Sequence, residues 1–220
     1  MMLLIRAAVV AAFILLLAGC TSSGQQASEQ LSAQQEQSAV PIFEFEEGTH
    51  YAVLASPLPD LAPVVEFFYF GCRSCYQLIP ELSQWSRRSG NNIALVPAHT
   101  ETKLVDGARL FHTFVEMGVL DKMYELGFVI YQTEESELYG KARIDDFLNR
   151  HQVDTQRFWD TWSSEAVNRR LATSQQLTRL AGVVKTPTFV VNGRYRVETD
   201  TIKSMDELYA LLTYLADKKI

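Results

Sequence analysis

Residues 64–70 constrain the fold more than any other segment, because a strand-length apolar run leads directly into two cysteines. The run reads Val-Val-Glu-Phe-Phe-Tyr-Phe between a proline and a glycine, and such a run is typical of a strand that is covered on both faces. In residues 72–88 apolar side chains recur at helical spacing, with Pro80 as an expected kink. The sequence therefore predicts a strand-to-helix junction that carries Cys72 and Cys75.

Further strand signals predict a mixed sheet around this junction. Residues 43–54 combine aromatic and β-branched residues and should begin the sheet, and residues 93–97 provide the second strand of a βαβ unit. Asn-Gly at 192–193 is a two-residue hairpin signal. It predicts an antiparallel pair of short strands, at residues 188–191 and 195–197.

Residues 101–180 are predicted to be helical, because apolar residues recur every three or four positions and strand signals are few. Breaks between the helices are expected near Gly118, Gly140 and Asp154. Ser204, with Glu207 three residues later, resembles a capping box and predicts a last helix that reaches Ala216. The expected order is strand, strand, helix, strand, helical block, hairpin and helix, which is a mixed α/β fold.

The first twenty residues predict export and a lipid anchor. Residues 7–18 are an unbroken apolar run after a single positive charge, as in a signal peptide, and the run is shorter than the about 20 residues of a spanning helix. Leu-Ala-Gly before Cys20 resembles a bacterial lipobox. The resemblance implies that a signal peptide at 1–19 is removed and that Cys20 carries lipid, with palmitate among the acyl chains. An uncleaved anchor and a secreted protein with an unrelated cysteine are the alternatives.

Residues 20–40 are predicted to be a flexible tether, because Ser, Gln, Ala and Glu offer almost nothing to bury. The folded part should begin near Pro41 and contain about 180 residues, enough for one domain with an insertion. The formal net charge of the chain is −6. This acidic balance argues against a nucleic-acid partner.

The cysteines predict a redox site. The chain has three, and with Cys20 assigned to lipid only Cys72 and Cys75 remain, in a loop too short to stabilise the fold much. A cysteine in the first turn of a helix gains thiolate character from the unpaired amides and the helix dipole. Cys72 is therefore the expected attacking sulfur and Cys75 the resolving one. Half of a zinc site and an inert disulfide are the alternatives, but zinc needs four ligands and the four histidines lack ligand spacing, so no metal is expected.

The order of elements, the CxxC at the first helix and the Thr-Pro before the hairpin resemble the DsbA family of thioredoxin-fold thiol:disulfide interchange proteins. Three segments carry the resemblance: residues 65–78, residues 184–195 and, more weakly, residues 45–51. The long interval between Cys75 and Pro187 is what a helical insertion requires, since a plain thioredoxin would need a far shorter one. The resemblance implies a thioredoxin-like domain with an inserted helical domain, with bounds at 41–100 and 181–220 for the first and 101–180 for the second.

Three further residues gain expected roles from the resemblance. Glu66 stands alone in the apolar strand, where an unpaired carboxyl tends to keep its proton. In the family the acid at this place lies beneath the dithiol and relays protons for the buried cysteine. Thr186-Pro187 resembles the cis-proline loop that faces the dithiol and pairs with the substrate strand. The alternatives are a solvent-facing Glu66 at a sheet edge and a trans surface turn at the proline.

The dipeptide between the cysteines is expected to tune the redox potential, because whatever stabilises the Cys72 thiolate makes the disulfide more oxidising. Strongly oxidising members of the family carry Pro-His at this place, whereas this chain has Arg73-Ser74. Ser74 can donate a hydrogen bond to the thiolate, and Arg73 adds a permanent charge. Thr186 replaces the valine of the prototype. The expected potential lies between those of thioredoxin and the strongest oxidants.

The expected function is the oxidation of cysteine pairs in unfolded or partly folded exported proteins. The resemblance implies no cofactor beyond the redox-active Cys72–Cys75 disulfide, a monomer, and re-oxidation by a DsbB-like membrane quinone reductase. Thr21 stands where inner-membrane lipoproteins carry an aspartate, which favours an outer-membrane anchor facing the periplasm. The alternatives are a reductase or isomerase with the same site, and a non-redox chaperone-like or adhesion lipoprotein.

Overall fold

The structure of the protein, a computed structural model, describes residues 42–59, 61–100, 104–133 and 141–218. The fold is that of the unit that begins at Phe43. The predicted signal peptide at 1–19, the lipid-bearing Cys20, the tether at 20–40 and the helix break near Gly140 lie outside the described residues.

The described residues contain one five-stranded sheet in the order β1-β5-β4-β2-β3. β2 and β3 are parallel and are joined by α2, as predicted, while β4 pairs antiparallel with β2 and β5, and β5 pairs antiparallel with β1. The arrangement confirms the thioredoxin fold. The bounds are β1 (Tyr51–Val53), β2 (Val64–Phe68), α2 (Arg73–Ser89), β3 (Ile93–Pro97), β4 (Thr188–Val191) and β5 (Tyr195–Val197).

The first predicted strand is shorter than expected. β1 contains only Tyr51–Val53 of the expected segment 43–54, because the chain turns just before it. Gly48 adopts a left-handed φ of 84°, and its amide donates to the carbonyl of Tyr51 at 2.8 Å. The amide of His50 also donates to the carbonyl of Glu46 at 2.9 Å, so residues 46–50 form a turn and not a strand.

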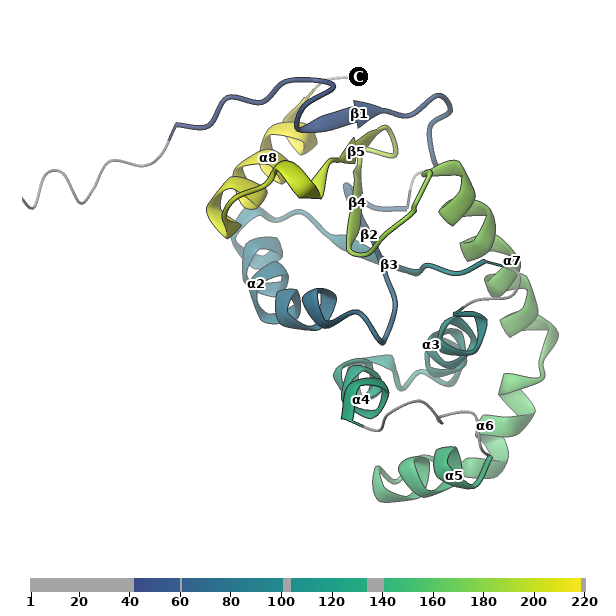
Figure 1. Cartoon of the computed structure of the whole chain (residues 1–220). Helices are drawn as coiled ribbons and strands as arrows, with labels where there is room; N and C mark the ends of the chain where they lie inside the picture. Colours follow the sequence, from purple (N-terminus) through teal and green to yellow (C-terminus); the bar gives the residue numbers. More distant parts are fainter. Residues whose placement is uncertain (1–41, 60, 101–103, 134–140, 219–220) are drawn as a thin grey trace, which may run out of the picture. The chain divides into compact units, whose positions relative to one another are not determined.

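Helices cover both faces of the sheet (Figure 1). On one face, Leu82 and Trp85 of α2 and Leu211 of α8 (Met205–Asp217) are buried together with side chains of β2, β4 and β5. On the other face, Leu177 of α7 (Glu165–Leu180) is buried against alternate residues of β2 and β4. All five residues of β2 are buried, which confirms the prediction of a strand covered on both faces.

The helical block lies between β3 and β4, as predicted. Gly118 ends its first helix with a left-handed φ of 70°, and Asp154 caps a later one by accepting the amide of Arg157 at 2.9 Å, so two of the predicted breaks are confirmed. The helices that precede α7 are α3 (Val105–Met117), α4 (Leu120–Thr133), α5 (Lys141–Arg150) and α6 (Thr155–Trp162).

The turn signals near the C-terminus are confirmed. Asn192 and Gly193 have φ values of 51° and 62°, as a two-residue hairpin requires. A Cβ at Gly193 would lie 2.7 Å from the Leu58 carbonyl oxygen, so no larger residue fits. Ser204 caps α8 by accepting the Glu207 amide. The Glu207 carboxylate, however, accepts from the amide of residue 203 rather than from that of Ser204.

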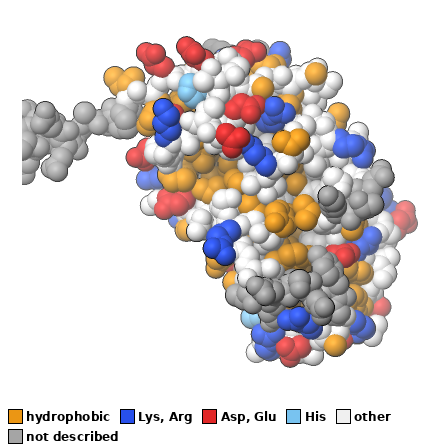
Figure 2. All heavy atoms as spheres, viewed as in Figure 1, with side chains coloured by type: hydrophobic (Ala, Val, Ile, Leu, Met, Phe, Trp, Pro, Cys, Tyr) orange, Lys and Arg blue, Asp and Glu red, His pale blue; other side chains and the backbone are white. Residues whose placement is uncertain are grey.

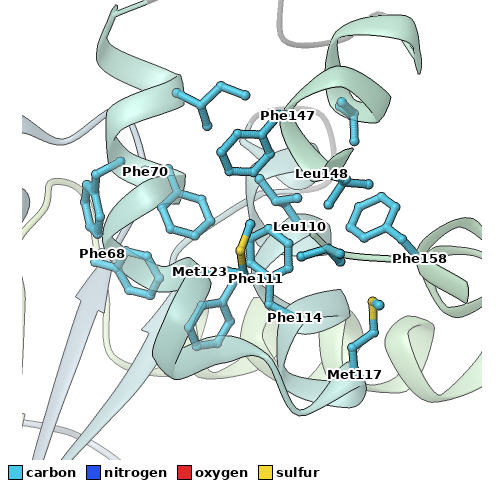
Figure 3. Packing of buried hydrophobic residues seen from close by; sticks show 14 of the residues in the cluster. Phe68, Phe70, Leu110, Phe111, Phe114, Met117, Met123, Phe147, Leu148 and Phe158 are labelled. Carbon is cyan, nitrogen blue, oxygen red and sulfur yellow. The ribbon is translucent and has the colours of Figure 1, made fainter. Parts of the chain in front are cut away.

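An aromatic cluster connects the end of β2 to the helical block (Figure 3). The Phe68 ring lies 5.2 Å from that of Phe111 in α3, and the Phe70 ring lies 5.2 Å from that of Phe128 in α4. Cys72 and Cys75 belong to the same buried cluster. The sheet and the helical block therefore pack together directly behind the predicted dithiol.

Replacing Gly127 by alanine tests this packing. A Cβ at Gly127 would lie 2.4 Å from Cε1 of Phe70, whose ring is 1 % exposed and has no room to move. We expect Gly127→Ala to lower the free energy of unfolding by about 1–3 kcal/mol, although alanine favours a helix by about 1 kcal/mol. Urea denaturation measures the change, with the exposed Glu125→Ala as the control on α4. A variant as stable as the wild type would contradict the packing.

Candidate active site

Cys72 is the N-cap of α2 rather than its first residue, because its φ and ψ of −79° and 103° are extended. Its Sγ accepts the amide of Cys75 at 3.1 Å. The first turn of α2 contains no acidic residue, so no carboxylate competes for the positive end of the helix dipole. The sulfur lies where unpaired amides favour negative charge.

Cys72 and Cys75 form a disulfide. Cys75 is 1 % exposed and Cys72 is 5 % exposed, so the second sulfur lies deeper in the cluster than the first. The Ser74 hydroxyl lies 3.4 Å from Cys72 Sγ, and it must be the donor because a disulfide sulfur carries no hydrogen. Arg73 is exposed, with no ion pair to another described residue.

Glu66 occupies the centre of β2, between Leu95 of β3 and Phe189 of β4. Its side chain is 3 % exposed, and its Oε1 has no hydrogen-bond partner among the described residues. Burial raises the pKa of this carboxyl to about 8. Since side chains alternate along a strand, Glu66 faces α2 together with Val64 and Phe68. It does not lie at a sheet edge.

The Thr186–Pro187 peptide bond is cis. Thr186 and Pro187 line the same groove as Ser74 of α2, a hollow of about 510 Å³. The groove therefore brings together the dipeptide between the two cysteines and the Thr-Pro motif, which are far apart in the sequence. Its apolar wall consists of Leu78, Pro187, Phe189, Ile202, Met205 and Leu208.

The groove has a charged border. Lys185 pairs with Asp200 at its margin, and Lys203 also lines it. In the space-filling view, hydrophobic side chains gather across the middle of the face, and charged side chains surround them (Figure 2). Sequence reasoning missed the apolar wall, although the helical spacing of Met205 and Leu208 was a usable signal.

The large aromatic residues around the dithiol differ in burial. Phe67, Phe68, Phe70 and Trp85 are buried. Tyr76, Trp159 and Trp162 are partly buried around the cluster behind the dithiol. None of them lines the groove beside Pro187.

Two histidines are buried away from the dithiol. The Nε2 atoms of His99 and His112 each lie 3.0 Å from the Ser174 hydroxyl. Ser174 of α7 thereby connects His99, which follows β3, with His112 of α3. Burial lowers the pKa of His99 and lowers that of His112 to about 3, so both are neutral. Both are therefore packing residues of the core. Beside them lies a second cavity of about 500 Å³, between β3, α3 and α7.

Among residues 42–59, 61–100, 104–133 and 141–218, no cluster of three or more His, Cys, Asp or Glu side chains could hold a metal ion. In the same part of the chain, none of the helices has the length and apolar character needed to span a bilayer.

The comparison with known families assigns residues 73–210 to the DSBA-like thioredoxin domain. The chain belongs to this family. The matched range includes Cys75, Thr186 and Pro187 and begins one residue after Cys72.

Relatives in the DSBA-like family match most of the chain. Thiol:disulfide interchange protein DsbA of Pseudomonas syringae is 30 % identical over 189 residues, which cover 83 % of this chain and 87 % of the relative. The protein of the same name from Pseudomonas aeruginosa is 29 % identical and covers 82 % and 89 %. A crystal structure of Pseudomonas aeruginosa DsbA is similar to this chain with a TM-score of 0.69 at 27 % identity, over 79 % of this chain and 93 % of that one.

The buried carboxyl predicts an unusual pH dependence of stability. The pKa of Glu66 is about 8 in the folded chain against 4.5 as the ordinary value, so between these pH values the unfolded chain releases a proton that the folded chain keeps. Stability should therefore fall as pH rises through this window. Across this pH window, we expect the unfolding free energy of the wild type to fall by roughly 3–5 kcal/mol more than that of Glu66→Gln.

Urea denaturation of the oxidised protein at both ends of the window measures this difference. Glu81→Gln, at an exposed position of α2, is the control for loss of a carboxylate. If the unfolding free energies of wild type and Glu66→Gln differed by the same amount at both pH values, the raised pKa of Glu66 would be contradicted.

Proposed function

We propose that this chain is a thiol:disulfide oxidoreductase that introduces disulfide bonds into exported proteins through Cys72 and Cys75. The observation that carries the proposal is a disulfide at the N-terminus of α2 with a buried, proton-bearing carboxyl in the strand behind it. The names of the relatives in the DSBA-like family support the same reaction.

The first step transfers the disulfide to the substrate. A substrate thiolate attacks Cys72 Sγ, a bond forms between the two sulfurs, and the Cys72–Cys75 bond breaks with its electron pair on Cys75. Glu66, whose pKa of about 8 keeps it protonated at neutral pH, gives its proton to the Cys75 sulfur. Cys75, almost fully buried, thus leaves as a neutral thiol instead of an unpaired buried thiolate.

The second step releases the product. Another substrate thiolate attacks the substrate sulfur that is bound to Cys72, the substrate disulfide forms, and Cys72 leaves as a thiolate. The amide of Cys75, the Ser74 hydroxyl and the end of α2 stabilise this thiolate. Two electrons have passed from the substrate to the dithiol, which a membrane quinone reductase of the DsbB type then re-oxidises.

The groove beside the dithiol holds the substrate chain. The backbone of Thr186 pairs with the extended segment that contains the reacting cysteine, and the missing amide of Pro187 leaves the sulfur accessible. Apolar side chains next to that cysteine rest on the wall that includes Phe189 and Leu208. Such contacts suit unfolded chains, whose apolar residues are exposed.

The direction of electron flow depends on the dithiol potential. Ser74 donates to sulfur without the charge of an imidazolium, so the proposed potential lies between those of thioredoxin and the strongest oxidants. A reductase or isomerase would use the same residues and keep Cys72 and Cys75 reduced in cells. The redox state of this pair in cells distinguishes them, and a mostly oxidised pair indicates an oxidase.

The proposed location is the periplasmic face of the outer membrane. Removal of the signal peptide at 1–19 exposes Cys20, whose lipid anchors the chain, and Thr21 directs it away from the inner membrane. The tether at 20–40 then carries the folded unit as a monomer. Metabolic labelling with palmitate tests the anchor, because Cys20→Ala should abolish the label.

Removing the Ser74 hydroxyl tests redox tuning. Ser74→Ala loses a hydrogen bond to the thiolate of about 1.5 kcal/mol, so the reduced form becomes less stable and the potential should fall by about 30 mV. Equilibration with glutathione measures the redox potential of the wild type and of Ser74→Ala. The control is Ser83→Ala, exposed on the same helix, which should leave the potential unchanged. A wild-type potential at or below that of thioredoxin would exclude the oxidase function.

Removing each sulfur tests the chemistry. In Cys75→Ala the resolving thiol is lost, so Cys72 should accumulate mixed disulfides with exported proteins, visible on non-reducing gels of cell envelopes. Cys72→Ala should form none and should lose the oxidation of reduced, unfolded substrates. Full activity of Cys72→Ala would instead favour a non-redox chaperone-like or adhesion protein.

A further inference from the structure

The core behind the dithiol contains a second polar atom without a partner. The hydroxyl of Tyr124 in α4 is buried and, like Oε1 of Glu66, it forms no hydrogen bond within the described residues. The Tyr124 residue is only partly buried as a whole, so its ring enters the cluster with the polar end inward. Buried polar groups are rarely left unpaired, and two in one region require an explanation.

Ring contacts place Tyr124 beside the face of β2 that carries Glu66. Its ring lies edge-on to Phe68, with centroids 5.3 Å apart, and Phe68 follows Glu66 by two residues on the same face of the strand. A second edge-on contact, at 5.3 Å, fixes the ring against Phe128. Since α4 also packs on α2, the Tyr124 ring lies close to both β2 and the dithiol helix.

The other groups around Glu66 do not offer it a charge. Leu95 of β3 and Phe189 of β4 flank it, Phe111 of α3 packs on Phe68, and Cys75 of α2 is tied in the disulfide. Glu66 forms no ion pair with any described residue. Burial, and then the charge of Glu66, raise the pKa of Tyr124, so its hydroxyl keeps its proton and can donate.

We propose that Tyr124 is a positioning residue for Glu66, and that its hydroxyl donates to the Glu66 carboxylate, directly or through one water molecule, once Glu66 has given its proton to Cys75. This inference rests on the proposed function. The carboxylate would otherwise remain as an unpaired buried charge. Tyr124 thereby makes Glu66 a stronger acid than burial alone would allow, and it sets the pH at which protons reach Cys75.

Tyr124→Phe removes only the hydroxyl and keeps the ring contacts. We expect the midpoint of the Glu66 carboxyl titration, followed by NMR of ¹³C-labelled glutamate in the oxidised protein, to rise by about one pH unit, which corresponds to a charge-assisted hydrogen bond. The pH profile of exchange with a cysteine peptide should move in the same direction. Tyr76→Phe, which removes a hydroxyl from a ring stacked on Phe128, should move neither.

A double-mutant cycle separates the pairing from a general effect on the fold. In a Glu66→Gln background, Tyr124→Phe should leave the exchange profile unchanged, because the acid through which it acts is absent. An unshifted Glu66 midpoint in Tyr124→Phe, or a profile shift that persists without Glu66, would overturn the inference. The titration reports on Tyr124 and Glu66 even if the dithiol exchanges with no substrate. A failure of the proposed function can therefore be distinguished from a failure of this inference.

Discussion

The rest of the structure depends on the complete burial of β2. This strand lies between β3 and β4, and helices cover it from both faces, so none of its five residues reaches solvent. An acid in such a strand loses its hydration, which is why Glu66 keeps its proton well above the ordinary pKa. The strand also ends at the aromatic cluster that fixes Cys72 at the start of α2.

The two sulfurs of the site lie in opposing environments. Cys72 caps a helix whose amides and dipole favour a thiolate, whereas Cys75 is buried in an apolar cluster that disfavours one. In the proposed exchange, this difference gives the two sulfurs unequal roles, one as the stable leaving thiolate and the other as the group that needs a proton. In the same proposal, the carboxyl of Glu66 supplies that proton, and it keeps the proton at neutral pH because it too is buried.

Much of the fold was predictable from local patterns. The apolar run before Cys72, the Asn-Gly hairpin and the serine cap of the last helix each reflect interactions between residues close in sequence, and the structure contains all three. The predicted bounds of the first strand were less accurate, because the chain forms a turn at Gly48. Glu66 could be singled out because one charged residue in an apolar strand is visible without a structure.

The sequence alone determined the cysteine pair at a strand-to-helix junction, the lone carboxyl before it and the helical block that separates them from Thr186-Pro187. Only the tertiary structure decided which distant residues meet them: the groove shared by Ser74 and Pro187, the serine that joins two buried histidines, and Tyr124 beside the face of β2 that carries Glu66. These neighbours come from elements separated by many residues, and packing between helices and sheet, which no local periodicity encodes, brings them together.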